Sequence, residues 1–142
     1  MPGNSIRPQQ PRGSRLIMLF SDNLSNIHSI YEYNGMYLMI YDPMTPVRSC
    51  SGKYSGGAPF MKEISEEEYQ ELKIEFDILA KKKENHTFDR SRPTGLFTSR
   101  NDKFIVRYGY YDEFENLLKK HQDEIDSSGD EQGAGEMVEY LS

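Results

Sequence analysis

Three histidines, His28, His86 and His121, are the side chains of this sequence best suited to proton transfer near neutral pH. They stand far apart, and none belongs to a closely spaced pair of the kind that binds zinc. We expect His121 near the end of the last helix, where its ring interacts with the final carbonyl groups. The single cysteine, Cys50, has no Cys-x-x-Cys partner and is interpreted as a structural thiol. These residues favour neither a bound metal nor a cofactor.

The basic residues that follow His86 suggest one catalytic hypothesis. A metal-free nuclease or hydrolase needs a general base, a general acid and cations that hold the phosphate. Arg90, Arg92 and Arg100 lie near His86 in the sequence, and either Glu32 or Glu84 would complete the set. A chain with 17 lysines and arginines offers such groupings easily, so this hypothesis remains an alternative.

The glycine-rich segment at residues 51–57 raises the question of a nucleotide site. In this segment Gly52-Lys53 is followed by Tyr54, and no glycine stands five residues before Gly52. The segment therefore fails the phosphate-loop pattern. It also precedes Pro59 instead of opening a helix, so the sequence predicts a flexible loop here.

Acidic residues are concentrated at the C-terminal end of the sequence. Residues 122–142 hold seven acidic side chains and no lysine or arginine, although the whole chain carries only −6. With these residues and the three arginines of residues 1–15 set aside, residues 16–121 carry −2. An acidic tail repels phosphate and attracts cations, which predicts a basic protein partner and argues against nucleic acid.

The sequence divides into an arm, one domain and a tail. Residues 1–15 mix proline, glycine, serine and arginine, so we predict a disordered arm without a secretory signal. Residues 16–121 are long enough for a single core, and residues 122–142 form a predicted disordered acidic tail. No apolar run approaches the length of a membrane span. A lone free thiol fits a reducing compartment, which predicts the cytoplasm.

The β-structure is predicted from two hairpins and one preceding strand. Residues 16–20 form a short apolar run typical of a buried strand. Asn34-Gly35, between residues 27–33 and 36–41, matches a two-residue type I′ turn. Residues 36–41 show no alternation, which indicates a strand covered on both faces. A second hairpin is predicted from residues 95–99 and 103–108.

Two helices and one long connection complete the expected elements. Residues 43–60 are rich in proline and glycine and predict an irregular connection, with a short strand near Val47–Cys50. Ser65 and Glu68 match a capping box, which starts a helix from about Glu66 to Lys83. Asp112 and Glu115 repeat that capping pattern before a final helix that ends near His121.

The element order predicts an α+β fold, with an antiparallel sheet of about five strands. Two helices cannot cover both sides of such a sheet, so we expect both on one face, leaving an aromatic and partly exposed face opposite.

No reaction centre emerges, so the main hypothesis is a non-catalytic protein-binding module. A small acidic α+β protein of this kind is similar in character to immunity proteins, which inhibit basic nuclease toxins; facing acidic and basic surfaces speed association. An adaptor or accessory subunit is a further alternative. The expected partner contacts lie on the first hairpin and before the last helix: Tyr31, Glu32, Tyr33, Tyr37, Tyr41, Tyr110, Tyr111 and Asp112.

Overall fold

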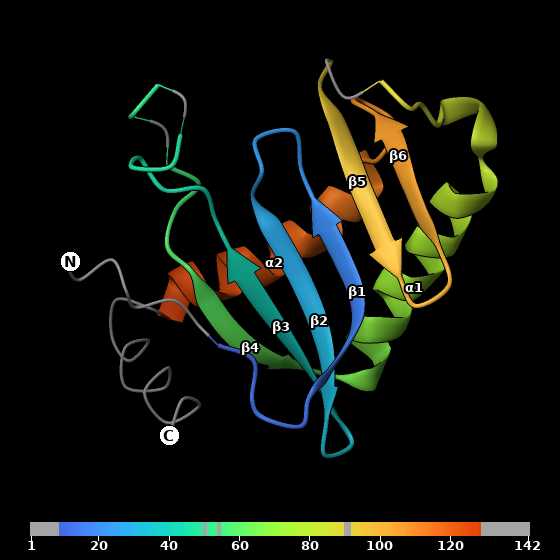
Figure 1. Ribbon diagram of the computed structural model, residues 1–142. Helices are drawn as coiled ribbons and strands as arrows, with labels where there is room; N and C mark the ends of the chain where they lie inside the picture. The colour runs from blue at the N-terminus through green and yellow to red at the C-terminus, as the bar shows by residue number, and fades with distance from the viewer. Residues whose placement is uncertain (1–8, 50, 54, 90–91, 129–142) are drawn as a thin grey trace.

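The computed structural model describes residues 9–49, 51–53, 55–89 and 92–128, and within these ranges it shows one six-stranded antiparallel sheet and two α-helices (Figure 1). The strand order is β4-β3-β2-β1-β5-β6. The strands are β1 (Arg15–Ser21), β2 (Ile27–Tyr33), β3 (Met36–Asp42), β4 (Phe60–Ile64), β5 (Thr94–Ser99) and β6 (Lys103–Arg107). The helices are α1 (Glu66–Lys81) and α2 (Asp112–Ser128). Both lie on the same side of the sheet, which confirms the predicted α+β fold.

The β2–β3 hairpin forms at the predicted Asn-Gly turn. Asn34 has a φ of 52° and Gly35 a φ of 78°, the two positive values that a type I′ turn requires. In β3, the four consecutive residues from Leu38 to Tyr41 are buried. The absence of alternation in this strand was therefore a correct sign that both of its faces are covered.

The connection after β3 differs from the prediction in two places. Residues 45–49 form turns, in which the backbone N–H groups of Arg48 and Ser49 bond to the carbonyl of Thr45. Val47 is 85% exposed, so the expected strand near Val47–Cys50 is wrong, and Cys50 itself lies outside the described residues. The additional strand is β4, which pairs with β3 from Phe60 to Ile64 directly after Pro59.

Helix α1 begins with the predicted capping box. The Ser65 hydroxyl accepts a hydrogen bond from the Glu68 N–H at 3.1 Å, and the Glu68 carboxylate accepts one from the Ser65 N–H at 2.8 Å. The helix ends at Lys81, two residues before the predicted end, and a short 3₁₀ turn (Lys83–Asn85) follows. Across the described ranges, no helix combines the length and apolar character needed to span a lipid bilayer.

Helix α2 begins at Asp112 as predicted but continues to Ser128 instead of ending near His121. The first residues assigned to the acidic tail are therefore helical. His121 lies within the helix and is buried, so its predicted contact with terminal carbonyl groups is wrong. Residues 1–8 and 129–142, which hold most of the expected arm and the rest of the expected tail, lie outside the described residues.

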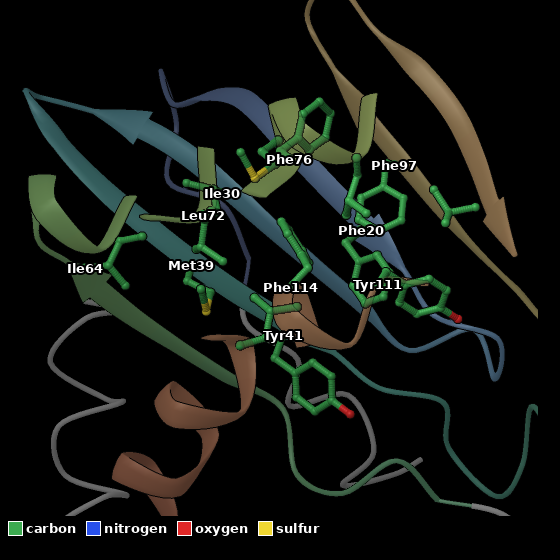
Figure 2. Close-up of a cluster of buried hydrophobic side chains, with 14 of the residues drawn as sticks. Phe20, Ile30, Met39, Tyr41, Ile64, Leu72, Phe76, Phe97, Tyr111 and Phe114 are labelled. Carbon is green, nitrogen blue, oxygen red and sulfur yellow. The ribbon is translucent and has the colours of Figure 1, made fainter. Parts of the chain in front are cut away.

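The main core fills the space between the sheet and both helices. Aromatic rings make up its centre near β1 and β5, where the Phe20 ring lies 4.8 Å from Phe97 and 5.3 Å from Phe114 (Figure 2). A second, smaller cluster of Leu38, Ile40 and Met61 has no helical member. Since side chains alternate along a strand, this cluster belongs to the opposite face of β3 and β4.

Candidate functional site

A cleft of about 520 Å³ opens between the sheet and α2. It lies at the ends of β1, β2 and β3 that are farthest from the Asn34-Gly35 turn. We call it the acidic cleft and define it by its principal lining residues. These are Phe20, Asp22, His28, Tyr41, Glu115 and Lys119. The loop at residues 56–58 forms its outer border. These residues come from segments that are far apart in the sequence, so only the folded chain brings them together.

Hydrogen bonds fix the wall of the acidic cleft. Asp22 accepts bonds from the backbone and side-chain amide of Asn26, at 2.9 and 3.0 Å. Asn26 in turn accepts a bond from the Met44 N–H at 2.8 Å, and the Gly56 N–H donates to the Met44 carbonyl at 2.9 Å. The Tyr41 hydroxyl completes this series of hydrogen bonds by donating to the Gly56 carbonyl at 2.6 Å.

Gly56 is required where the wall is tightest. A Cβ atom at this position would lie 2.0 Å from the Asn26 Oδ1 atom, which cannot move freely because it already holds the Met44 N–H. Glycine therefore permits the close approach of two loops, and this approach places Asp22 at the rim of the cleft.

Glu115 is the most strongly perturbed acid of the cleft. Burial raises its pKa to about 7, and the negative charges of Asp22 and Asp112 add to the effect. Within the described part of the chain, no lysine, arginine or histidine forms a salt bridge with the Glu115 carboxylate. Lys119 stands one helical turn later and also lines the cleft. The Glu115 carboxylate is therefore half-buried, close to like charges and not neutralised by a partner.

His28 contributes a neutral aromatic ring to the cleft. Burial lowers its pKa to about 3, with a smaller contribution from His121. Its ring is partly exposed but stacks on Tyr41 with a centroid separation of 4.4 Å, and its Nδ1 atom is buried without a hydrogen-bond partner. At neutral pH the ring therefore carries no charge.

These groups allow two kinds of chemistry. Two carboxylates beside aromatic rings can hold a cation whose stem is apolar, as in a lysine or arginine side chain. A carboxyl group with a pKa near 7 next to a neutral imidazole can also act as a general acid or base. Both possibilities depend on Glu115, because its proton is exchanged close to neutral pH.

The partner contacts predicted just before the last helix differ in their exposure to solvent. Tyr111 is 1% exposed and belongs to the core, so it is not available to a protein partner. Tyr110 is 54% exposed, Asp112 is exposed, and Tyr108 nearby is 60% exposed. Burial raises the pKa of the Tyr111 hydroxyl, and the negative charges of Glu115, Asp22 and Asp112 add to this effect.

The predicted contacts on the first hairpin do not form one surface. Tyr41 is buried in the cleft wall, on the helix-covered face. Tyr31 and Tyr33 are partly buried on the opposite face, against the cluster of Leu38, Ile40 and Met61. The opposite face of the sheet therefore carries partly buried aromatic side chains at these two positions.

Two further predicted contacts on this hairpin have neighbours of their own. Glu32 forms an ion pair with Arg15, and the Tyr37 ring stacks on Tyr69 of α1 with a centroid separation of 4.3 Å. Both lie near the Asn34-Gly35 turn, at the end of the sheet away from the cleft.

His86 has a structural environment. Its Nε2 atom lies 2.8 Å from the carbonyl oxygen of Leu79, and its ring stacks on Phe104 at 4.8 Å. The backbone of His86 pairs with Val106, whereas Arg100 lies in the turn at the other end of β6. His86 and Arg100 therefore lie at opposite ends of β6 and do not converge on one point, and Arg90 lies outside the described residues.

A second polar cluster joins α1, α2 and β4. One ligand atom each from Glu68, His121 and Glu124 lies within 4.8 Å of the other two. Lys62 donates to the Glu124 carboxylate at 2.6 Å. Burial lowers the pKa of His121, and Lys62 adds to this effect, while Glu68 and Glu124 oppose it. These are the described residues best placed to hold a metal ion.

Sequence reasoning missed the acidic cleft because its parts come from distant segments. The sequence pattern indicates only a capping role for Glu115 and no role for Asp22. A usable signal was present in the spacing of Glu115 from Phe114 and Leu118, since it places the acid at the border of the apolar helix face. Comparison with protein-family models, with curated proteins and with solved structures yields no significant match.

Proposed function

We propose that this protein is a non-catalytic binding module that recognises a basic protein and accepts one of its lysine or arginine side chains in the acidic cleft. The observation that carries the proposal is the state of Glu115. Its carboxylate is half-buried near Asp22 and Asp112, and its pKa of about 7 reflects the cost of holding charge there without a counter-ion. A cation from a partner would remove that cost.

The shape of the cleft suits a long cationic side chain. Arginine and lysine carry apolar stems, which pack favourably on aromatic rings such as that of His28, the cleft ring that belongs to a partly exposed residue. A guanidinium group forms paired hydrogen bonds with carboxylates, and Asp22 and Glu115 both line the cleft. His28 adds a neutral ring and no opposing charge.

The rim supplies further contact area. Tyr108 and Tyr110 are more than half exposed and lie beside Asp112 at the start of α2. Tyrosine is favoured in protein interfaces because it buries a large area and keeps a polar hydroxyl group. The acidic net charge of −6 would speed the encounter with a basic partner.

Inhibition of the partner is the form of this function that we favour. An acidic protein that covers a cationic active site blocks it without any chemistry of its own, as an immunity protein does. An adaptor would use the same contacts without inhibition. We propose a reducing compartment such as the cytoplasm as its location, because a lone free thiol is compatible with such a compartment.

The test compares the chain with a variant in which the cleft has lost its charge, Asp22→Asn combined with Glu115→Gln. Both proteins are immobilised, exposed to a cell extract at low salt and eluted with a salt gradient. We expect a basic protein to elute from the wild-type chain and to be absent or strongly reduced with the variant. The control is Glu66→Gln with Glu67→Gln, which removes the same charge from exposed positions of α1. Equal retention by all three proteins would show that the cleft is not the binding site.

A direct measurement uses a labelled tetra-arginine peptide and fluorescence anisotropy. Since Glu115 must ionise to bind a cation, affinity should rise as the pH increases through about 7. Loss of one such charge pair, worth about 1 kcal/mol, weakens binding roughly fivefold. The Glu115→Gln variant should therefore bind more weakly at high pH and show no rise in affinity over this range.

General acid–base catalysis is a second candidate, favoured by the pKa of Glu115 and by the neutral ring of His28 in the same cleft. In that case Glu115 would donate or accept a proton on a substrate bound between α2 and β2. Hydrolysis of model phosphodiester and ester substrates, with a rate that depends on pH near 7 and is lost in Glu115→Gln, would favour catalysis over binding alone.

A further inference from the structure

The cluster at His121 lies where three elements meet, on the same side of the sheet as the main core. His121 comes from the middle of α2, Glu68 from the first turn of α1, and Glu124 from the next turn of α2. One ligand atom of each lies within 4.8 Å of the other two. The Nδ1 atom of His121 lies 3.9 Å from the Oε2 atom of Glu68.

The imidazole of His121 is buried with an unused nitrogen. The residue is 4% exposed, and its Nδ1 atom has no hydrogen-bond partner. A buried polar atom without a partner costs about 1–3 kcal/mol, so a fold that keeps one usually has a use for it. This nitrogen lies next to the carboxylate of Glu68, and an ion bound there would satisfy both groups.

Glu68 is already oriented for such a role. Its Oε1 atom accepts the Ser65 N–H at 2.8 Å in the capping box of α1, while Oε2 is the atom nearest to His121. A carboxylate held by a second hydrogen bond is typical of metal ligands, because that bond fixes the direction of the free oxygen.

Lys62 provides a cation at the third ligand. Its side chain is 14% exposed, and its ammonium group donates to Glu124 Oε2 at 2.6 Å. The Glu124 side chain is 58% exposed and can change its rotamer. The Lys62 ammonium group therefore neutralises the Glu124 carboxylate, and it would compete with any cation that binds the cluster.

We propose that Glu68, His121 and Glu124 form a binding site for a divalent transition-metal ion, with zinc as the ion that best suits one imidazole and two carboxylates. Zinc bonds of about 2.0–2.2 Å bring its ligand atoms closer together than they are here, so Glu124 must move inward. Three protein ligands leave a fourth position for water. The bound ion would connect α1 with α2, independently of any partner in the acidic cleft.

The first measurement titrates the full chain with Zn²⁺ in competition with a chromophoric chelator, and with Co²⁺ as a spectroscopic substitute. We expect one ion per chain, visible d–d absorption bands of cobalt, and a thermal midpoint that rises with zinc concentration. Failure to compete with the chelator, with no cobalt bands and no shift of the midpoint, would overturn the proposal.

Matched variants then assign the ion to this cluster. Glu124→Ala removes a ligand from an exposed position, so the chain should remain folded and lose at least about tenfold in affinity. Asp123→Ala makes the same charge change one residue earlier, outside the cluster, and should leave affinity unchanged. Lys62→Met removes the competing cation and should increase affinity.

His121→Ala completes the series, provided that circular dichroism shows a folded chain. Equal zinc affinity in the wild-type chain, Glu124→Ala and Lys62→Met would place the ion elsewhere and refute the site. None of these outcomes depends on the acidic cleft, so failure here leaves the proposed binding function untouched.

Discussion

Replacing Glu115 with glutamine should make the stability of this protein less dependent on pH. The pKa of Glu115 rises from 4.5 to about 7 on folding, which corresponds to about 3.4 kcal/mol at about 1.36 kcal/mol per unit. Because the side chain is only half-buried, solvent screening reduces the usable effect to about 1–2 kcal/mol. Glutamine keeps nearly the same shape and removes the titration.

The sign follows from proton binding. Glu115 has a higher pKa in the folded than in the unfolded chain, so the folded state binds its proton more tightly. The associated stability is fully present below about pH 4.5 and is lost as the pH rises through about 7. The Glu115→Gln variant should match the wild-type chain in acid and exceed its stability by about 1–2 kcal/mol at about pH 8.

Urea denaturation at several pH values between these limits measures the difference directly. Glu113→Gln serves as the control, because Glu113 is an exposed carboxylate on the same helix. A difference between wild type and Glu115→Gln that stays constant over the whole pH range would refute the reasoning, as would a variant that is less stable than the wild-type chain at high pH.

Three other substitutions test the core, the cleft wall and the helix start, each by urea denaturation against the wild-type chain. Tyr111→Phe removes a buried hydroxyl without a partner, so stability should be unchanged or rise by about 1 kcal/mol; a clear loss would show that the hydroxyl is hydrogen-bonded. Gly56→Ala places a methyl group 2.0 Å from Asn26 Oδ1 and should cost about 2 kcal/mol; an unchanged midpoint would mean that the loops separate freely. Ser65→Ala breaks the capping box and should cost about 1 kcal/mol, with reduced helical circular dichroism; no change would assign the start of α1 to packing alone.

Elements with a local signal were predicted from the sequence. The turn at Asn34-Gly35 depends on two adjacent residues that tolerate positive φ, and it forms where expected. Helix α1 begins at its capping box because Ser65 and Glu68 satisfy free N–H groups within one turn. In such cases the residues that decide the structure are neighbours in the chain.

Features that depend on distant contacts could not be predicted in this way. Strand β4 is short and follows Pro59, and it forms because its partner β3 offers a free edge. Beyond His121, helix α2 continues through a polar stretch of sequence. Hydrophobic periodicity alone assigns such a stretch to a tail. The acidic cleft needs Asp22, His28 and Glu115 together, and no short pattern contains all three.

The open sheet has two edge strands, β4 and β6, and different features protect each of them from pairing with another molecule. At β6, the Ile105 carbonyl already receives the Thr87 N–H, so a foreign strand finds part of that edge occupied. At β4, the outer strand has five residues, begins after Pro59 and carries the exposed Glu63. A short strand, a preceding proline and a charged side chain all disfavour backbone pairing with an edge strand of another molecule. A change of Glu63 to an apolar residue should therefore favour aggregation in concentrated solution, even where it leaves the folding equilibrium unaltered.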